Sequence, residues 1–231
     1  MNSNKKRWQA VVAALIVIAI LVIDQWIKIE VKTTMPLHSR REVASWFYIY
    51  FIENNGMAYG MTFIPKYALS IFRMVAIVVI GWYLGRQIMK GARWVFVIIL
   101  AMVLAGAAGN LIDCMFYGLI FTQSSPDYVS YMVPFGQGYS GFLTGKVVDM
   151  FYFPLIVTTY PDWVPVYGGE PFIFFQPIFN FADAAITTSV ISFLLFCRKE
   201  LSMMGNGGKE KTDGEENDAD NVDDTESIEQ K

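Results

Sequence analysis

The chain has 231 residues, of which 54% are hydrophobic and 16% aromatic, and its formal net charge at pH 7 is −3. This composition is typical of an integral membrane protein and excludes an ordinary water-soluble domain. Ten of the 21 acidic residues lie in residues 209–231, so the rest of the chain is mildly basic, although its basic residues are not concentrated as a nucleic-acid-binding face would require.

The first predicted element is a membrane span over residues 8–27, preceded by the basic sequence NKKR. About 20 apolar residues suffice to cross the hydrocarbon core. A signal peptide would need small residues at a cleavage site after this span. The chain instead has Asp24, Gln25 and Lys28 there, so we expect an uncleaved helix. Asp24 and Lys28 are spaced i, i+4, so a helix brings them together, and a structural ion pair is sufficient to explain them.

The segment 29–67 contains a β-branched and aromatic run that stops at Asn54-Asn55-Gly56. This pattern predicts a strand followed by a tight turn. His38, the one histidine, lies next to two arginines and is interpreted as a loop residue.

Two further spans are predicted over residues 69–89 and 94–117. The second of these carries Asn110 and Asp113 at a spacing of i, i+3, directly after the small residues 106–109. Small residues let a neighbouring helix approach closely, and polar side chains can then hydrogen-bond across the contact, so packing alone accounts for this cluster.

The segment 118–171 contains a polar stretch rich in glycine and proline, followed by KVVDMFYF at 146–153, which contains Asp149 and is predicted to be extended. The fourth predicted span covers residues 172–197 and contains the sequence FNFAD, with Asp183.

Basic residues precede the first span, bracket the turn between the second and third, and follow the fourth, so the positive-inside rule places both termini in the cytoplasm. The predicted fold class is an all-α integral membrane protein with four transmembrane helices and a small extracytoplasmic β element, formed by the segments 29–67 and 118–171. We expect a membrane-embedded domain over residues 1–200. The acidic residues 201–231 have few apolar side chains to bury, which predicts a disordered cytoplasmic tail.

Asp149 and Asp183 are harder to explain as structural residues, because both lie among apolar residues. Ionisable residues in such positions are candidates for function. If the two carboxyls meet, repulsion and desolvation would leave them sharing one proton. Such a pair works as in an aspartic protease, where one carboxylate activates water and the other acid polarises the scissile carbonyl.

Other hydrolytic sites do not fit the sequence. There is no H-E-x-x-H motif, and His38 lies outside the spans, which argues against a Ser-His site at membrane depth. Cys114 and Cys197 have no metal-ligand spacing, and no dinucleotide or phosphate loop is present.

Five motifs, in this order, resemble those of lipoprotein signal peptidase, the type II signal peptidase of bacterial membranes: DQWIK at 24–28, NNGMAYG at 54–60, GAAGNLID at 106–113, VVDMF at 147–151 and FNFAD at 179–183. The resemblance covers residues 8–199. It implies a four-helix aspartic endopeptidase in the bacterial cytoplasmic (inner) membrane, with its active site near the outer face. Such an enzyme cleaves prolipoproteins just before a cysteine that carries a diacylglyceryl group.

On this resemblance, Asp149 and Asp183 correspond to the two catalytic aspartates. Further motif residues carry over as supports of the site or as substrate contacts: Asp24, Lys28, Asn54, Gly56, Ala58, Asn110, Asp113, Asn180 and Ala182. The implied partners are the diacylglyceryl prolipoprotein and membrane lipid, without nucleic acid. No metal or organic cofactor is implied, and a monomer is expected.

The sequence departs from the family in two ways. The family usually has an arginine after the aspartate of GNLID, where this chain has Cys114, and Arg73 is a candidate replacement. The stretches 113–149 and 149–183 are also longer than expected, and the additional material, rich in Tyr, Phe and Pro, is a candidate lid or partner surface.

Two other functions stay open at this point. A small ion or proton carrier would use Asp24, Asp113 and Asp183 to line a pathway through the helices. A passive assembly factor would need none of the aspartates for catalysis.

Overall fold

The computed structural model describes residues 3–55, 65–163 and 165–197. The chain divides into two compact units, Met1–Val190 and Ile191–Lys231. In the second unit only residues 191–197 are described. The predicted tail over residues 201–231 lies outside the described residues, and every site residue that is described lies in the first unit.

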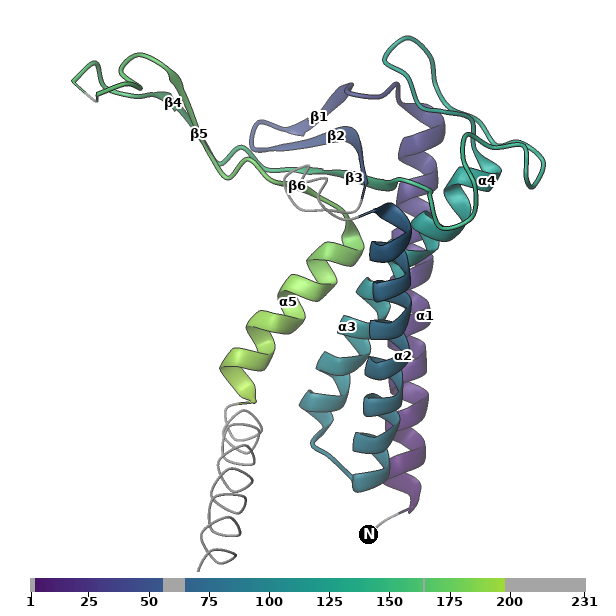
Figure 1. Cartoon of the computed structure of the whole chain (residues 1–231). Helices are drawn as coiled ribbons and strands as arrows, with labels where there is room; N and C mark the ends of the chain where they lie inside the picture. The colour runs from purple at the N-terminus through teal and green to yellow at the C-terminus, as the bar shows by residue number, and fades with distance from the viewer. Residues whose placement is uncertain (1–2, 56–64, 164, 198–231) are drawn as a thin grey trace, which may run out of the picture. The chain divides into compact units, whose positions relative to one another are not determined.

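Three long apolar helices lie side by side in the first unit (Figure 1). Helix α1 covers Ser3–Thr34, α2 covers Lys66–Lys90 and α3 covers Trp94–Ile112. By length and composition, α1, α2 and the continuous segment Trp94–Ile120 can each cross a membrane. The first three predicted helices are therefore confirmed, although α1 extends beyond its predicted range at both ends.

The helix that begins as α3 contains a π-helical turn near its end. It continues as a π-helical turn, η2, over Asp113–Tyr117 and finishes in the short helix α4, Gly118–Ile120. A π-helical turn contains one more residue than an α-helical turn and often lies at a functional site.

A four-stranded antiparallel sheet lies at one end of these helices (Figure 1). Its strands, in spatial order, are β1 (Arg40–Ala44), β2 (Phe47–Asn54), β3 (Val147–Tyr152) and β6 (Ile178–Phe179). The predicted strands before Asn54 and around Asp149 are thus confirmed as β2 and β3. These two strands pair directly, with Ile52 opposite Asp149.

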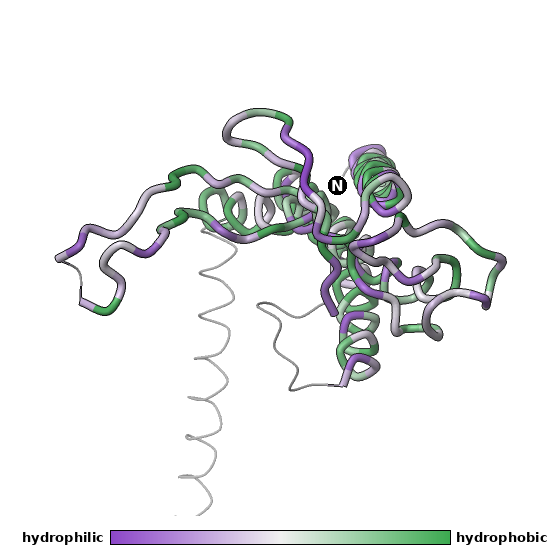
Figure 2. The backbone as a smooth tube through the Cα atoms, turned by 90° about the horizontal axis from the view of Figure 1, so that it is seen from above, coloured by the Kyte–Doolittle hydropathy of each residue, from purple (hydrophilic) through white to green (hydrophobic). Residues whose placement is uncertain are grey.

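A second hairpin stands apart from this sheet. Strands β4 (Ile156–Thr159) and β5 (Pro171–Phe174) pair only with each other and extend away from helices α1 to α3, as Figure 1 and Figure 2 both show. Neither strand was predicted from the sequence.

The predicted fourth span, residues 172–197, is wrong at its start. Strands β5 and β6 occupy its first third, and helix α5 begins only at Phe181 and ends at Phe196. A short apolar run does not distinguish a strand from a helix, and Pro171 and Pro177, which flank the run, favour the strand. The described part of α5 has 16 residues and is about 24 Å long.

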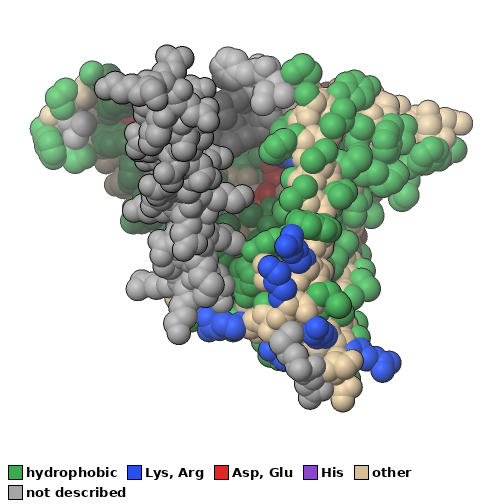
Figure 3. Space-filling view, turned by 60° about the horizontal axis from the view of Figure 1, so that its bottom comes forward, with side chains coloured by type: hydrophobic (Ala, Val, Ile, Leu, Met, Phe, Trp, Pro, Cys, Tyr) green, Lys and Arg blue, Asp and Glu red, His purple; other side chains and the backbone are tan. Residues whose placement is uncertain are grey.

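Basic side chains gather at the helix ends opposite the sheet (Figure 3). They come from the start of α1, the end of α2 and the start of α3: Lys5, Lys6, Arg7, Arg86, Lys90 and Arg93. Between these ends and the sheet, large apolar side chains on α1 and α2 are exposed, as on a lipid-facing surface. Examples are Leu15, Val22, Phe72 and Val78, each at least 60% exposed.

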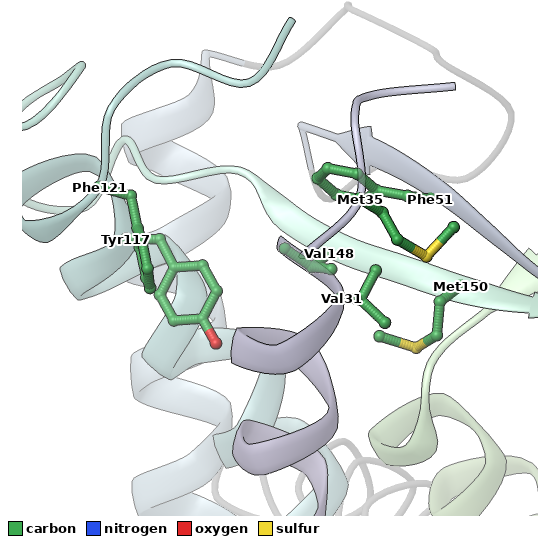
Figure 4. Close-up of a cluster of buried hydrophobic side chains, with 7 residues drawn as sticks. All are labelled: Val31, Met35, Phe51, Tyr117, Phe121, Val148 and Met150. Atoms are coloured by element: carbon green, nitrogen blue, oxygen red, sulfur yellow. The ribbon is translucent and has the colours of Figure 1, made fainter. Parts of the chain in front are cut away.

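The sheet is fixed to the helices by a buried hydrophobic cluster at their common end (Figure 4). The cluster draws on α1, on β2 and β3, and on the segment that follows α3; it comprises Val31, Met35, Phe51, Tyr117, Phe121, Val148 and Met150. Because β3 supplies two of these side chains, the strand that carries Asp149 is held firmly on the end of the helices.

Helices α3 and α5 pack backbone against backbone at the small residues of α3. A Cβ atom added at Gly106 would lie 2.5 Å from the Ala182 carbonyl oxygen, and one added at Gly109 would lie 2.8 Å from Asp24 Oδ2. Since real Cβ atoms essentially never come so near, only glycine fits at these two positions. The close helix contact predicted from residues 106–109 is confirmed.

We expect Gly106→Ala to destabilise the protein by about 1–3 kcal/mol, because the added methyl group must push α5 away from α3. The matched control is Gly85→Ala in α2, where an added Cβ meets nothing within 4 Å and alanine is favoured in a helix. Thermal unfolding of both variants in detergent micelles, followed by tryptophan fluorescence, provides the comparison. Equal unfolding midpoints would contradict the proposed close packing.

Candidate active site

Asp149 and Asp183 come from different elements and are connected through one asparagine. Asp149 lies in β3 and is 2% exposed, whereas Asp183 lies in the first turn of α5 and is half-buried. Asn180, fully buried between β6 and α5, donates from Nδ2 to Asp149 Oδ1 at 2.7 Å. Its Oδ1 accepts from the Asp183 backbone N–H at 2.9 Å. The structure thus brings both predicted aspartates to one site.

The start of α5 explains why FNFAD contains both an asparagine and an aspartate. The Asn180 side chain accepts from the N–H of Asp183, and the Asp183 carboxylate accepts from the N–H of Asn180 at 3.3 Å. This reciprocal arrangement is a capping box, and it also places a carboxylate at the positive end of the helix dipole. Asp183 therefore has a structural role as well as its candidate chemical role.

Both carboxyl oxygens of Asp149 accept hydrogen bonds from amides, Oδ1 from Asn180 and Oδ2 from Asn54. Burial raises the pKa of Asp149 to about 7, and the nearby Asp183 carboxylate contributes to the increase, while the two amide donors oppose it. The two amide bonds and the nearby Asp183 carboxylate thus act on the same proton of Asp149.

A fully buried ion cluster lies beside the two aspartates. Lys28 Nζ is 2.9 Å from a carboxylate oxygen of Asp24 and 2.9 Å from one of Asp113, and all three side chains are inaccessible to solvent. The predicted Asp24–Lys28 pair is confirmed, and Asp113 completes it. Since one cation faces two carboxylates, the remaining charge must be balanced by hydrogen-bond donors.

Those donors come from several elements. Gln25 Nε2 donates to Asp113 Oδ1 at 2.9 Å and to Asp24 Oδ2 at 3.2 Å. The backbone N–H of Val148 in β3 donates to Asp113, and that of Ala182 in α5 donates to Asp24. The cluster therefore joins α1, the end of α3, β3 and α5 at one point.

Asn110 connects this ion cluster to the aspartates. Its Oδ1 accepts from Lys28 Nζ at 2.9 Å and from Asn180 Nδ2 at 3.0 Å, while its Nδ2 donates to Asp183 Oδ1 at 2.7 Å. A continuous path of hydrogen bonds thus leads from the buried cation to the Asp183 carboxylate. The amide is fixed in one orientation, because exchanging its oxygen and nitrogen would break all three bonds.

Most of the predicted site residues join this network; they are Asp24, Lys28, Asn54, Asn110, Asp113, Asp149, Asn180, Ala182 and Asp183. Ala182 takes part through its backbone, and its side chain faces Gly109. Gly56 and Ala58 lie outside the described residues.

Sequence reasoning missed a second buried ion pair. Lys32 Nζ lies 2.5 Å from Glu53 Oε1, and Ser124 Oγ donates to the same oxygen at 2.7 Å. Burial would raise the pKa of Glu53, but the Lys32 ammonium and the Ser124 hydroxyl hold it below its usual range. Glu53 directly precedes Asn54, so this pair secures the part of β2 that contacts Asp149. Lys28 and Lys32 are spaced i, i+4, and this spacing was the available signal.

Gln25 and Tyr117 were also missed as site residues. The Tyr117 hydroxyl donates to Gln25 Oε1 at 3.1 Å and so holds the glutamine that bridges Asp24 and Asp113. Gln25 lies within the DQWIK motif, whereas no local pattern marks Tyr117, because its partner is 92 residues away.

Arg73 of α2 reaches the position that follows Asp113. Its Nη1 lies 3.4 Å from Cys114 Sγ. The contact agrees with the candidate chosen from the sequence, and the suggestion that Arg73 replaces the family arginine stays a prediction.

The chemistry available at the site is that of carboxyl and amide groups. Over residues 3–55, 65–163 and 165–197, no three His, Cys, Asp or Glu side chains are grouped so that they could hold a metal ion. Two interacting carboxyls, one of which holds its proton up to about pH 7, can act as an acid and a base toward the same substrate.

Comparisons with known proteins agree on one family. The model of a family described as Signal peptidase (SPase) II matches residues 16–198. A lipoprotein signal peptidase of Porphyromonas gingivalis is 45% identical over 205 residues, which cover 88% of this chain and 90% of the relative. One from Amoebophilus asiaticus is 34% identical over 83% of this chain and 78% of its own length. A solved structure described as a bacterial membrane enzyme has the same fold, with a TM-score of 0.53 at 24% identity, covering 83% of this chain and 90% of that one.

We expect Lys28→Met to destabilise the protein by about 3–5 kcal/mol, because it leaves two carboxylates buried without their cation. The control is Arg7→Met, which removes an exposed cation from the same helix and should change stability by less than about 0.5 kcal/mol. Thermal unfolding in detergent micelles measures both effects. If the Lys28 variant unfolds at the temperature of the control, the ion cluster does not organise the site.

Proposed function

Because the chain belongs to the signal peptidase II family, we propose that it removes the signal peptides of prolipoproteins by aspartic hydrolysis, with Asp149 and Asp183 as the catalytic pair. The observation that carries this proposal is the pairing of a buried, proton-holding Asp149 with a more exposed Asp183 through Asn180. Two interacting carboxyls with separate environments are the usual basis for dividing acid and base roles.

In the proposed reaction, Asp183 is the general base and Asp149 the general acid. Asp183 is the more accessible carboxyl, so a water molecule bound there loses its proton to Asp183 as it attacks the scissile carbonyl. The proton on Asp149 polarises that carbonyl and stabilises the negative charge that develops on its oxygen. When the C–N bond breaks, the proton taken up by Asp183 passes to the departing amine, and both carboxyls return to their starting states.

The amide groups around the pair supply orientation. Asn54 and Asn180 hold the carboxyl plane of Asp149, and Asn110 holds that of Asp183. We assign Asp24, Lys28, Asp113 and the Ala182 backbone to the support of these groups. Gly56 and Ala58 remain proposed substrate contacts.

The proposed substrate is a prolipoprotein whose cysteine carries a diacylglyceryl group, cleaved immediately before that cysteine. Its signal helix and acyl chains would lie in lipid, while the scissile bond would reach the end of the helices where the sheet lies. The exposed apolar sides of α1 and α2 are consistent with a lipid environment. The protein would act as a monomer.

We propose that α5 is the fourth crossing of the bacterial cytoplasmic membrane. Basic residues gather at the helix ends opposite the sheet (Figure 3), which supports a cytoplasmic location for both termini and an outer location for the aspartates. The membrane-embedded domain would cover residues 1–200, followed by the acidic cytoplasmic tail, 201–231.

The ion-carrier alternative gains no support from the contacts. It needs carboxylates at successive depths, but Asp24, Asp113 and Asp183 belong to one network at one end of the helices. Asp24 and Asp113 are also held by the same lysine.

We expect Asp149→Asn and Asp183→Asn each to lower cleavage of a diacylglyceryl-modified prolipoprotein by about 10³-fold or more, because either change removes one proton-transfer group. Asparagine has nearly the same shape as aspartate and keeps one accepting oxygen at each position, so the fold should persist. Asp127→Asn, an exposed acid in the segment after α4, is the matched control. Gel-shift assays of the processed lipoprotein measure activity, and unfolding temperatures verify the fold. Full activity in either dyad variant would exclude the aspartic mechanism.

We expect kcat/KM for this cleavage to fall about tenfold per pH unit above pH 7, because Asp149 then loses the proton that the mechanism requires. Its pKa is raised by the fold, so the competent protonated form is present below pH 7 and is lost as the pH rises. Asn54→Ala removes a donor that favours the carboxylate, so the pKa of Asp149 should rise and the decline should move to higher pH. Rate profiles from pH 5 to about 9 test both statements. If kcat/KM declines at the same pH in the variant as in the unchanged protein, Asn54 does not influence the pKa of Asp149.

A further inference from the structure

The β4–β5 hairpin exposes several large apolar side chains, and such exposure is unfavourable in water. Six of them are at least half exposed: Leu155, Ile156, Val157, Trp163, Val166 and Phe174. Trp163 and Val166, near the tip, reach 81% and 88%. Among the described residues no third strand pairs with it, and an isolated two-stranded hairpin is marginally stable in water at best.

Both faces of the hairpin are apolar. Ile156 is paired with Phe174, and Val157 is paired with Ile173. Successive residues of a strand point to opposite faces, so the first pair lies on one face and the second pair on the other. A hairpin that packed on a single protein partner would need only one apolar face. An apolar medium that surrounds the hairpin explains both.

The charges of the hairpin are few and acidic. In residues 154–163 and 165–177 the charged residues are Asp162 and Glu170, and there is no lysine or arginine. Tyr160, Trp163 and Tyr167 lie in the same distal part. Aromatic side chains with a polar atom are enriched at the boundary between lipid and water. The absence of cations points to a neutral or zwitterionic lipid rather than an acidic one.

The base of the hairpin is continuous with the region where the helices end. The Phe153 ring stacks on Phe47 at 4.6 Å and on Phe179 at 5.7 Å, and Trp46, which is 56% exposed, stacks on the Phe153 ring from the β1–β2 turn. Phe179 lies just before α5. The hairpin therefore leaves the protein at the level where apolar helix surface gives way to the sheet (Figure 1).

We propose that the β4–β5 hairpin is an interfacial membrane anchor that lies in the headgroup region of the leaflet next to the sheet, with Trp163, Val166 and Phe174 in contact with lipid. Strand β3, which carries Asp149, leads into β4 after a short link. Contact with lipid would therefore hold the strand that bears Asp149 at a fixed height above the acyl chains.

Single cysteines labelled with an environment-sensitive fluorophore test this anchor. Cys114 and Cys197 are each 1% exposed, so an added exposed cysteine can be labelled selectively, with the unchanged chain as the labelling blank. Trp163→Cys and Val166→Cys are compared with Val75→Cys on the exposed side of α2 and with Glu42→Cys on β1, a charged exposed position of the sheet. Each is reconstituted as one copy per phosphatidylcholine nanodisc and quenched by acyl-brominated lipid or by iodide.

We expect brominated lipid to quench labels at 163 and 166 within about twofold of the label at 75, whereas iodide quenches chiefly the label at 42. Iodide quenching at 163 and 166 equal to that at 42 would place the hairpin in water and overturn the proposal. If the labels at 163 and 166 are protected from iodide only with two copies per disc, the surface binds a second copy. If they are protected only with added prolipoprotein, the surface binds substrate. Both outcomes also overturn the anchor. No cleavage is measured, so the result is independent of the proposed function.

Discussion

The candidate site depends on the buried Lys28 ammonium. Lys28 lies between the carboxylates of Asp24 and Asp113, and none of the three side chains meets solvent. A buried ion pair is worth little unless its remaining hydrogen-bonding capacity is met, because desolvation of the charges opposes their attraction. Here the donors that meet it come from Gln25, β3 and α5. The buried charges are therefore satisfied only when the elements that bear Asp149 and Asp183 are in place. Satisfying these charges and assembling the site are thus coupled.

The candidate site uses the same groups for structure and for chemistry. Asn180 Oδ1 caps α5 by accepting from the N–H of Asp183, and its Nδ2 donates to Asp149. A neutral amide can do both because it offers donors and an acceptor without adding charge between two carboxyls. Asp183 is both the third helical residue of a capping box and the more accessible carboxyl of the pair. The FNFAD sequence is consequently explained by helix initiation as well as by the proposed hydrolysis.

The sequence predicted what depends on local pattern and missed what depends on distant pairing. Spans over the first three helices, the i, i+4 pair at Asp24 and Lys28, and the strand around Asp149 followed from periodicity and spacing. Five ordered motifs identified the family, and the comparisons confirm it. The start of the fourth span was wrong, because an apolar run of PFIFF type suits a strand as well as a helix. The Glu53–Lys32 pair and the contact of Tyr117 with Gln25 join residues far apart in the chain. For the first, the spacing of Lys28 and Lys32 was the one available signal, and for the second no local pattern exists.

The π-helical turn at Asp113–Tyr117 makes the site sensitive to the number of residues in this segment as well as to their identity. Each residue of an α-helix turns the chain by about 100°, so the extra residue of a π turn redirects everything that follows it. Asp113 and Tyr117, at the two ends of that turn, both reach the Gln25 side chain, and the chain after α4 leads to Ser124 at Glu53. Loss of one residue here would rotate these partners away from each other together, which no single substitution in the turn can do. Relatives that keep this alignment should therefore conserve the length of this segment as strictly as its Asp113 and Tyr117 side chains.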